Sequence, residues 1–233
     1  MTVPLPLVLV PGLLCSARLY APQVAALWPH GPILVADHRQ HDDMPGIAAD
    51  ILAQAPPRFA LAGLSMGGYI ALTMLQQAPQ RIAKLALLDT SARPDTPEQT
   101  AARQQLIGLA HVGKLNQVVD TLAPRFLHRA RRDDATLNSI IRDMAADTGA
   151  EAFVRQEKAI MGRPDARPVL ATIHCPTLVL VGEGDELTPP ELAREIAAGI
   201  AGSRLVIVPD CGHLSTLEKP DAVNGALADW LRG

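Results

Sequence analysis

The sequence predicts an α/β fold: a doubly wound, mostly parallel sheet of six strands that carries an inserted cap of four helices. Three observations lead to this prediction. Short apolar runs alternate with helical segments in both ends of the chain, which favours parallel strands joined by right-handed crossovers. The pattern Gly63-Leu64-Ser65-Met66-Gly67 joins one apolar run directly to a helical run. In the middle of the chain, residues 97–163 contain helical patterns and no strand-like run.

The six expected strands are short and apolar along most of their length. Such continuous apolar runs suit strands that are buried on both faces of a parallel sheet. The first run ends at Pro11-Gly12, so the chain enters its sheet at once. The expected strands cover residues 5–10, 33–36, 59–64, 84–89, 177–181 and 205–208.

Helical spacing of apolar residues follows most of these runs. Residues 16–27 form the first expected helix, with Ser16 as its N-cap. Thr188 is the expected cap of a later helix, because proline follows it and Glu191 stands three residues after it. The other expected helices of the sheet layers cover residues 47–55, 66–78 and 220–231.

The middle segment predicts helices separated by glycines such as Gly113 and Gly149. Insertions at the carboxyl ends of parallel strands usually overhang the ligand crevice, so we expect a cap over the site. A separate helical domain that does not contact the site is the alternative. We therefore assign residues 1–90 and 169–233 to the core and residues 91–168 to the cap. The four expected cap helices cover residues 101–112, 115–122, 135–146 and 151–161.

Charge and hydropathy exclude several kinds of partner. The 233 residues carry a formal net charge of −3, which offers no electrostatic footprint for nucleic acid or anionic lipid. No apolar run approaches the ~20 residues that cross a bilayer, and the first residues lack the pattern of a signal peptide. We therefore expect small-molecule substrates, no membrane contact and a cytoplasmic location. The sequence contains no pattern that indicates an oligomeric state.

The three cysteines, Cys15, Cys175 and Cys211, are too few and too scattered for a disulfide framework. None of them belongs to a pair at metal-ligand spacing. They are expected to be small buried side chains. The sequence predicts neither a metal site nor an organic cofactor.

Three candidate catalytic residues each follow the carboxyl end of an expected strand: Ser65, Asp185 and His213. A serine hydroxyl is a weak nucleophile at neutral pH and needs a base that takes its proton, here His213. A carboxylate such as Asp185 holds the imidazole in the correct tautomer and stabilises the imidazolium. Asp89, at the end of the fourth expected strand, is the competing acid.

The Gly-x-Ser-x-Gly pattern and the order serine, aspartate, histidine resemble the α/β-hydrolase superfamily. In that superfamily the serine occupies the nucleophile elbow, a strained turn between a strand and a helix. The chain is similar to bacterial carboxylesterases and enol-lactone hydrolases over nearly its whole length. The hairpin that opens the sheet in larger members has no counterpart here, so six strands are expected instead of eight. By this resemblance, the backbone N–H groups of Leu13 and Met66 form the oxyanion hole.

The sequence departs from the family pattern near the expected oxyanion hole. Pro11-Gly12 stands where the family usually has His-Gly, so the hydrogen bonds that support this loop must differ. Residues 37–41, Asp-His-Arg-Gln-His, resemble the family's Asp-x-Arg-Gly-His stretch, with Gln40 in place of glycine. We interpret this stretch as structural.

The residues and the resemblance together predict a serine hydrolase that cleaves a carboxylic ester, thioester or lactone through an acyl-enzyme. Carbon–carbon bond hydrolases and perhydrolases of the superfamily keep the same three residues, so these reactions stay open. A ligand-binding protein with negligible turnover is the alternative from a different class. An arginine in the pocket, from Arg125, Arg129 or Arg131, would favour a carboxylated substrate. The apolar candidates for the pocket lining are Leu106, Leu109, Phe126, Ile140, Met144, Phe153 and Met161.

Overall fold

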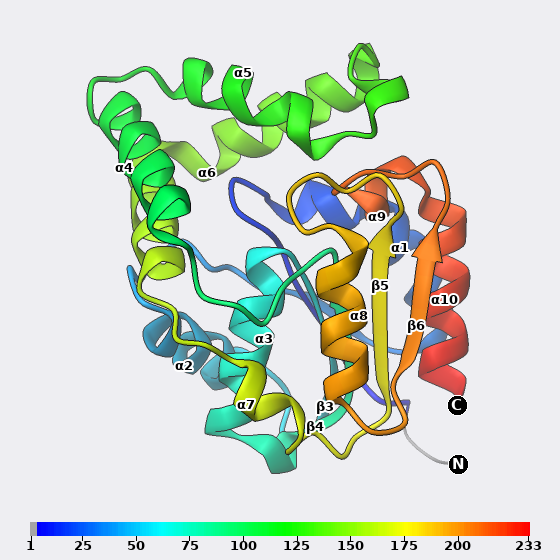
Figure 1. Ribbon diagram of the computed structural model, residues 1–233. Helices are drawn as coiled ribbons and strands as arrows, with labels where there is room; N and C mark the ends of the chain where they lie inside the picture. Colours follow the sequence, from blue (N-terminus) through cyan, green and yellow to red (C-terminus); the bar gives the residue numbers. More distant parts are fainter. Residues whose placement is uncertain (1–3) are drawn as a thin grey trace.

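The centre of the molecule is one sheet of six strands in the order β2-β1-β3-β4-β5-β6. The structure is a computed structural model that describes residues 4–233. Each pairing among the described strands is parallel, so the predicted α/β class and strand number are confirmed (Figure 1). The strands are β1 (Leu7–Val10), β2 (Ile33–Val35), β3 (Phe59–Leu64), β4 (Ile82–Leu88), β5 (Thr177–Gly182) and β6 (Arg204–Val208).

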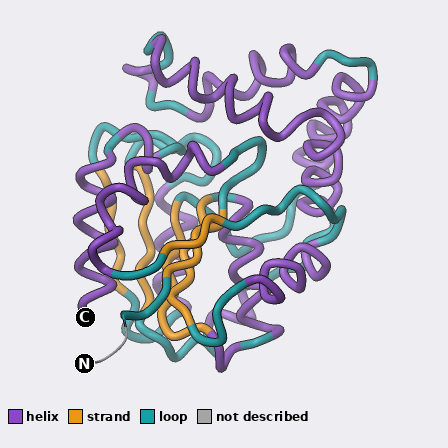
Figure 2. Tube along the Cα trace, turned by 180° about the vertical axis from the view of Figure 1, so that it is seen from behind, coloured by secondary structure: helices purple, strands orange, loops and turns teal. Residues whose placement is uncertain are grey.

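Helices cover both faces of the sheet, as a doubly wound fold requires. Successive side chains of β1 point to opposite faces: Leu7 and Leu9 belong to one core cluster, and Val8 and Val10 belong to the other. The first cluster is completed by α1 (Ala21–Leu27) and α10 (Pro220–Arg232). The second is completed by α2 (Met44–Gln54), α3 (Met66–Gln77) and α8 (Pro190–Gly199). In Figure 2 the strands form a band between these helices.

The predicted helix over residues 16–27 is divided in the structure. A 3-10 helix, η1 (Ala17–Tyr20), precedes α1, and the Ser16 hydroxyl accepts a hydrogen bond from the Arg18 N–H, as a cap does. The helix α2 begins three residues earlier than predicted, because Asp43 caps it by accepting the Gly46 N–H at 2.7 Å. Three further 3-10 helices are η2 (Trp28–His30), η3 (Pro79–Arg81) and η4 (Arg129–Arg131).

The prediction that Thr188 caps a helix is wrong. The helix α8 begins at Pro190, and no side chain caps its first turn. The hydroxyl of Thr188 instead donates to Asp185 Oδ2 at 2.7 Å. The helix starts one residue later than predicted, so the residue before it is Pro189, whose side chain has no atom that could accept a hydrogen bond.

Three helices lie beyond the carboxyl ends of the strands: α4 (Pro97–His111), α5 (Leu115–Phe126) and α6 (Ala135–Met161) (Figure 1). Two of the predicted helices, 135–146 and 151–161, are halves of α6. They meet at Gly149, whose φ of 77° and ψ of 162° interrupt the helical path. The segment thus contains four helical stretches, as predicted, although two of them are continuous in hydrogen bonding.

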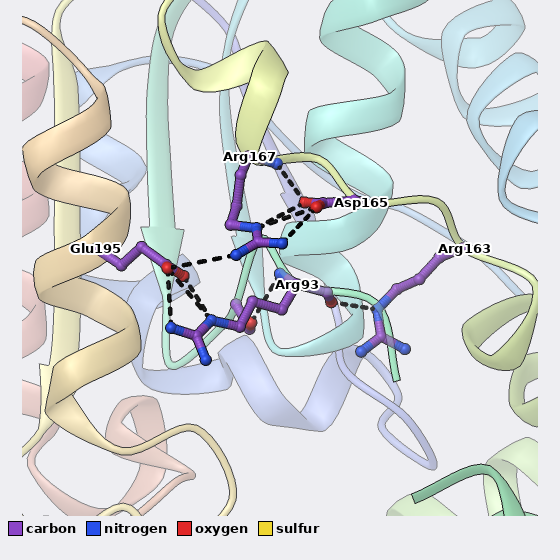
Figure 3. A network of polar contacts seen from close by, with 6 residues as sticks. Arg93, Arg163, Asp165, Arg167 and Glu195 are labelled. Carbon is purple, nitrogen blue, oxygen red and sulfur yellow. Dashed lines mark hydrogen bonds and ion pairs between the residues drawn. The ribbon is translucent and has the colours of Figure 1, made fainter. Parts of the chain in front are cut away.

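The chain enters and leaves this helical segment at neighbouring points. The Ala166 N–H donates to the Ala92 carbonyl at 2.9 Å, and Arg163 Nε donates to the Arg93 carbonyl at 3.1 Å. Arg93 also forms an ion pair with Glu195 of α8 at 2.9 Å, and Arg167 and Asp165 extend the network (Figure 3). The chain segments that lead into and out of the helical segment are therefore bonded to each other, and Arg93 also bonds to α8 of the core. Two short helices complete the chain: α7 (Arg167–Leu170) and α9 (Ser215–Glu218).

Candidate active site

Ser65 lies at the sharp turn between β3 and α3. Its φ of 56° and ψ of −116° are strained values for a residue with a side chain. The turn leaves no room beside it: a Cβ on Gly63 would lie 2.1 Å from the Gly67 carbonyl oxygen, and one on Gly67 would lie 2.0 Å from the Val10 carbonyl oxygen. Glycine is thus required on both sides of the serine. The Thr90 hydroxyl, which donates to the Ser65 carbonyl at 2.7 Å, supports the turn from the neighbouring strand end.

The three side chains predicted to act together form one hydrogen-bonded chain. His213 Nε2 lies 2.8 Å from Ser65 Oγ, and His213 Nδ1 lies 2.8 Å from Asp185 Oδ2. Because a carboxylate only accepts, Nδ1 carries the proton and Nε2 presents its lone pair to the serine hydroxyl. The ring of Phe126, from α5, stacks on the imidazole with centroids 6.2 Å apart. His213 and Asp185 are both buried, so water does not compete for the bond between them.

The carboxylate of Asp185 is held by its own loop. Oδ1 accepts the N–H groups of Leu187 at 2.8 Å and Thr188 at 3.0 Å, and Oδ2 accepts the Thr188 hydroxyl. Burial by itself raises the pKa of Asp185, but His213 and these donors outweigh burial and hold that pKa below its ordinary value. The sequence analysis did not predict the bond from the Thr188 hydroxyl to Asp185. An aspartate followed three residues later by a threonine in a loop is a local pattern that indicates such a side-chain bond.

The pKa of His213 is shifted in the opposite direction to that of Asp185. Burial lowers its pKa, but the charge and hydrogen bond of Asp185, followed by the charges of Asp89 and Glu218, raise the pKa above its ordinary value. An imidazole with a raised pKa holds a proton more firmly once it has received one from the serine.

Asp89, the competing acid, occupies a different position. Its Oδ1 accepts the Gly182 N–H at 2.9 Å, and its Oδ2 accepts the hydroxyl of Ser215. Burial, and then the charge of Asp185, raise the pKa of Asp89 well above its ordinary value. The carboxylate that is hydrogen-bonded to His213 is therefore that of Asp185, while Asp89 joins the strand ends to the start of α9.

Glu218 holds the loop that carries His213 and was not predicted from the sequence. Its Oε1 accepts the Gly212 N–H and its Oε2 accepts the His128 N–H, both at 2.8 Å. His128 follows α5, so one buried carboxylate connects the histidine loop to the helical segment above it. No local sequence pattern indicates this contact, because His128 and Glu218 are separated by 90 residues.

The two N–H groups expected to form an oxyanion hole are unengaged. Within residues 4–233, neither the Leu13 nor the Met66 N–H donates to a protein acceptor. Met66 is the first residue of α3, where a backbone N–H has no partner within the helix. Leu13 lines the same cavity as Ser65. One of the two residues therefore shares the cavity with the serine, and the other follows the serine directly in the chain.

A cavity of about 280 Å³ opens beside Ser65 and His213. The core contributes Gly12 and Leu13, and the helical segment contributes apolar side chains. Of the seven apolar candidates, Leu106 and Phe126 line this cavity. Leu109, Ile140, Met144, Phe153 and Met161 do not line it. Helical spacing predicts which face of a helix is apolar but not whether that face meets a cavity or another helix.

The cavity wall also carries charged side chains. Arg103 forms ion pairs with Asp95 at 2.6 Å and with Glu157 at 2.7 Å, and Arg163 pairs with Asp95 at 2.8 Å. Arg125, also in the wall, is exposed and forms no ion pair with any described residue. Of the three arginines considered from the sequence, Arg125 is the one that lines the cavity; Arg129 and Arg131 do not.

The described residues include no group of three or more His, Cys, Asp or Glu side chains that could hold a metal ion. Cys15 lines the cavity, and burial raises the pKa of its thiol to about 12, so this thiol is not ionised near neutral pH. Among the helices of residues 4–233, none is both long enough and apolar enough to cross a membrane.

Several known proteins resemble this chain over most of its length. A pimeloyl-(acyl-carrier protein) methyl ester esterase from Neisseria meningitidis serogroup B is 27% identical over 226 residues, covering 91% of this chain and 86% of the relative. A thermophilic esterase from Thermogutta terrifontis, solved with malate bound, superimposes with a TM-score of 0.90 at 29% identity, covering 100% of this chain and 91% of that one. The enol-lactonase from Burkholderia xenovorans LB400 gives the same TM-score and identity, covering 100% and 93%.

The chain also matches a protein-family model over most of its length. The model of the alpha/beta hydrolase family matches residues 7–226, which include all six strands and the predicted site residues. The chain therefore belongs to the alpha/beta hydrolase family and is an enzyme of the hydrolase type.

Proposed function

We propose that this enzyme is a serine hydrolase that cleaves a small carboxylic ester, thioester or lactone through an acyl-enzyme. In this proposal Ser65 is the nucleophile, His213 is the general base and Asp185 orients the imidazole. The observation that carries the proposal is the hydrogen-bonded chain from Asp185 through His213 to Ser65, with both links at 2.8 Å, beside a cavity.

The reaction follows from this geometry in two halves. Ser65 Oγ attacks the carbonyl carbon while His213 Nε2 takes its proton, and the carbonyl oxygen becomes negatively charged. The N–H groups of Leu13 and Met66 stabilise that oxygen. When the intermediate collapses, His213 returns the proton to the leaving alcohol, thiol or enol. Water then attacks the acyl-enzyme with the same base, releasing the acid and restoring the serine.

The reaction class is also supported by the relatives. One is named as a methyl ester esterase, another as an esterase and a third as an enol-lactonase. All three names describe cleavage of a carboxylic ester or a cyclic ester. In this reading residues 1–90 and 169–233 form the catalytic core, and residues 91–168 form the cap that determines which esters enter. We keep the cytoplasm as the proposed location.

The charge of the cavity wall favours a substrate with a carboxylate remote from the scissile bond. Arg103 and Arg163 are balanced by Asp95 and Glu157, whereas Arg125 has no acidic partner among the described residues. A cationic side chain without a partner at the wall of a cavity attracts an anionic group of a ligand. We therefore propose half-esters of dicarboxylic acids, or lactones with a free carboxylate, as the preferred substrates.

A fluorophosphonate probe tests the proposal without a choice of substrate. Intact mass is measured after incubation of the wild type, Ser65→Ala and His213→Ala, with each variant first verified as folded by circular dichroism. We expect one adduct per wild-type chain, mapped to Ser65, and none on either variant. A folded wild type that forms no adduct would contradict the proposal, because Ser65 would then not be an activated nucleophile.

A further inference from the structure

The peptide group between Gly12 and Leu13 is anchored through its carbonyl oxygen. Its carbonyl oxygen lies 2.9 Å from His38 Nε2 and also accepts the Cys15 N–H at 3.1 Å. The carbonyl and the Leu13 N–H belong to one planar trans unit, so they point in opposite directions. Anchoring the carbonyl therefore fixes the direction of the Leu13 N–H. A rotation of this one peptide would turn the donor away from the position of the substrate oxygen.

The next residue of the loop is held by the helical segment. Gln156, on α6, accepts the Leu14 N–H with Oε1 at 3.1 Å, and its amide nitrogen lies 3.2 Å from His38 Nε2. His38 is 3% exposed and Gln156 is fully buried. Leu14 has a φ of 56°, which is costly for a residue with a side chain and persists only when its surroundings hold it. The bond from Gln156 supplies such a restraint.

The protonation state of His38 is determined by its partner. A carbonyl oxygen only accepts, so the 2.9 Å contact with Gly12 requires a proton on His38 Nε2. The amide nitrogen of Gln156 is also a donor, so its approach to the same ring nitrogen is a packing contact and not a hydrogen bond. Burial lowers the pKa of His38, which keeps the ring neutral at neutral pH. A neutral imidazole in one tautomer is a fixed donor, suited to holding a backbone carbonyl.

We propose that His38 and Gln156 are positioning residues that hold the Leu13 N–H in the orientation needed for an oxyanion hole, so that seating of α6 on the core and assembly of the hole are coupled. This inference rests on the proposed function, in which the Leu13 N–H stabilises the oxyanion. It also explains how the loop is supported where Pro11-Gly12 replaces the usual His-Gly pair. The restraints come from residues that are 26 and 142 positions away in the chain.

The test compares variants that remove each restraint with variants that keep it. His38→Leu removes the donor to Gly12, and Gln156→Met removes the acceptor for Leu14 with little change in volume. His38→Gln retains an N–H donor near the position of Nε2. Arg155→Met is the matched control, because Arg155 is also on α6 and donates to the Arg39 carbonyl at 2.7 Å without touching the Leu13 peptide. Thermal unfolding verifies that each variant is folded.

With 4-nitrophenyl acetate as the probe, we expect His38→Leu and Gln156→Met to lower kcat roughly 10- to 100-fold. We expect KM to change less than about threefold, since ground-state binding is not affected. His38→Gln should recover most of the activity, and Arg155→Met should stay near wild type. A loss in Arg155→Met equal to that in Gln156→Met would overturn the proposal, because general seating of the cap would then explain both.

Crystal structures of the wild type, His38→Leu and Arg155→Met provide a readout that does not depend on turnover. We expect the Gly12–Leu13 peptide to rotate in His38→Leu and to stay in place in Arg155→Met. An unchanged peptide in His38→Leu would overturn the positioning role, whatever its activity. If the wild type forms no adduct with the fluorophosphonate probe while the peptide still rotates in His38→Leu, the proposed function fails and the positioning role stands.

Discussion

Two buried aspartates, Asp185 and Asp89, differ in the groups that donate to them. The carboxylate of Asp185 accepts from its own loop and faces His213, while that of Asp89 accepts from Gly182 and Ser215. Burial raises the pKa of both side chains, but the net shifts are opposite: the pKa of Asp185 is lowered and that of Asp89 is raised. The facing imidazole and the donors of its own loop lower the pKa of Asp185, whereas the charge of Asp185 adds to the effect of burial at Asp89.

The raised pKa of His213 predicts the pH dependence of catalysis. A protonated imidazole cannot accept the serine proton, so kcat/KM should fall as the pH decreases through the pKa of His213. Because that pKa lies above the ordinary value of 6.5, the midpoint of the acidic limb should also lie above 6.5. A pH profile of kcat/KM with a neutral ester measures it. A midpoint at or below 6.5 would contradict the predicted influence of Asp185.

Replacing each aspartate separately tests which acid acts on His213. Asp185→Asn should lower kcat roughly 10³- to 10⁴-fold, because the imidazole loses its orienting carboxylate. It should also move the acidic limb to lower pH, since Asp185 provides the main stabilisation of the protonated ring. Asp89→Asn is the matched control, for it keeps an acceptor for the Gly182 N–H and should retain most activity. Equal losses in the two variants would argue against Asp185 as the sole orienting acid.

At the scale of elements, the turn from β3 to α3 depends on the absence of two side chains. Gly63→Ala would place its Cβ 2.1 Å from a backbone oxygen, which cannot move without displacing the start of α3. We expect the free energy of unfolding to fall by roughly 1–3 kcal/mol or more. Gly108→Ala is the control within α4, where the added Cβ would lie within 4 Å of nothing but its own stretch of helix. It should increase stability by roughly 0.5–1 kcal/mol. Urea unfolding compares the two.

The strands and the site positions were accessible from the sequence because both rest on local patterns. Continuous apolar runs identified all six strands, and Ser65, Asp185 and His213 each follow one of them. Contacts between distant residues left no such pattern. Nothing near Gln156 indicates that its amide meets Leu14, and nothing near Glu218 indicates His128. Thr188 was misassigned because the local sequence allows a helix to start at either of the two prolines that follow it, and the helix starts at the second, Pro190.

At the scale of the whole molecule, the balance of charge around the cavity predicts selectivity. Arg125→Gln should lower kcat/KM for a mono-4-nitrophenyl ester of glutaric acid roughly 3- to 10-fold relative to 4-nitrophenyl valerate. Arg129→Gln is the control, since Arg129 is exposed but does not line the cavity. The preference for the charged ester should also weaken as salt is added. An unchanged ratio in Arg125→Gln would remove the support for a carboxylated substrate.

The hydrogen bond between Ala92 and Ala166 joins the two ends of the segment that contains α4, α5 and α6. The entropy of closing a loop grows only slowly with its length. The helices between these two residues can therefore be lengthened, shortened or exchanged during evolution while the strands of the sheet keep their register. In the proposed division, chemistry belongs to the core and selectivity to the helical segment, and the two are then free to diverge at different rates.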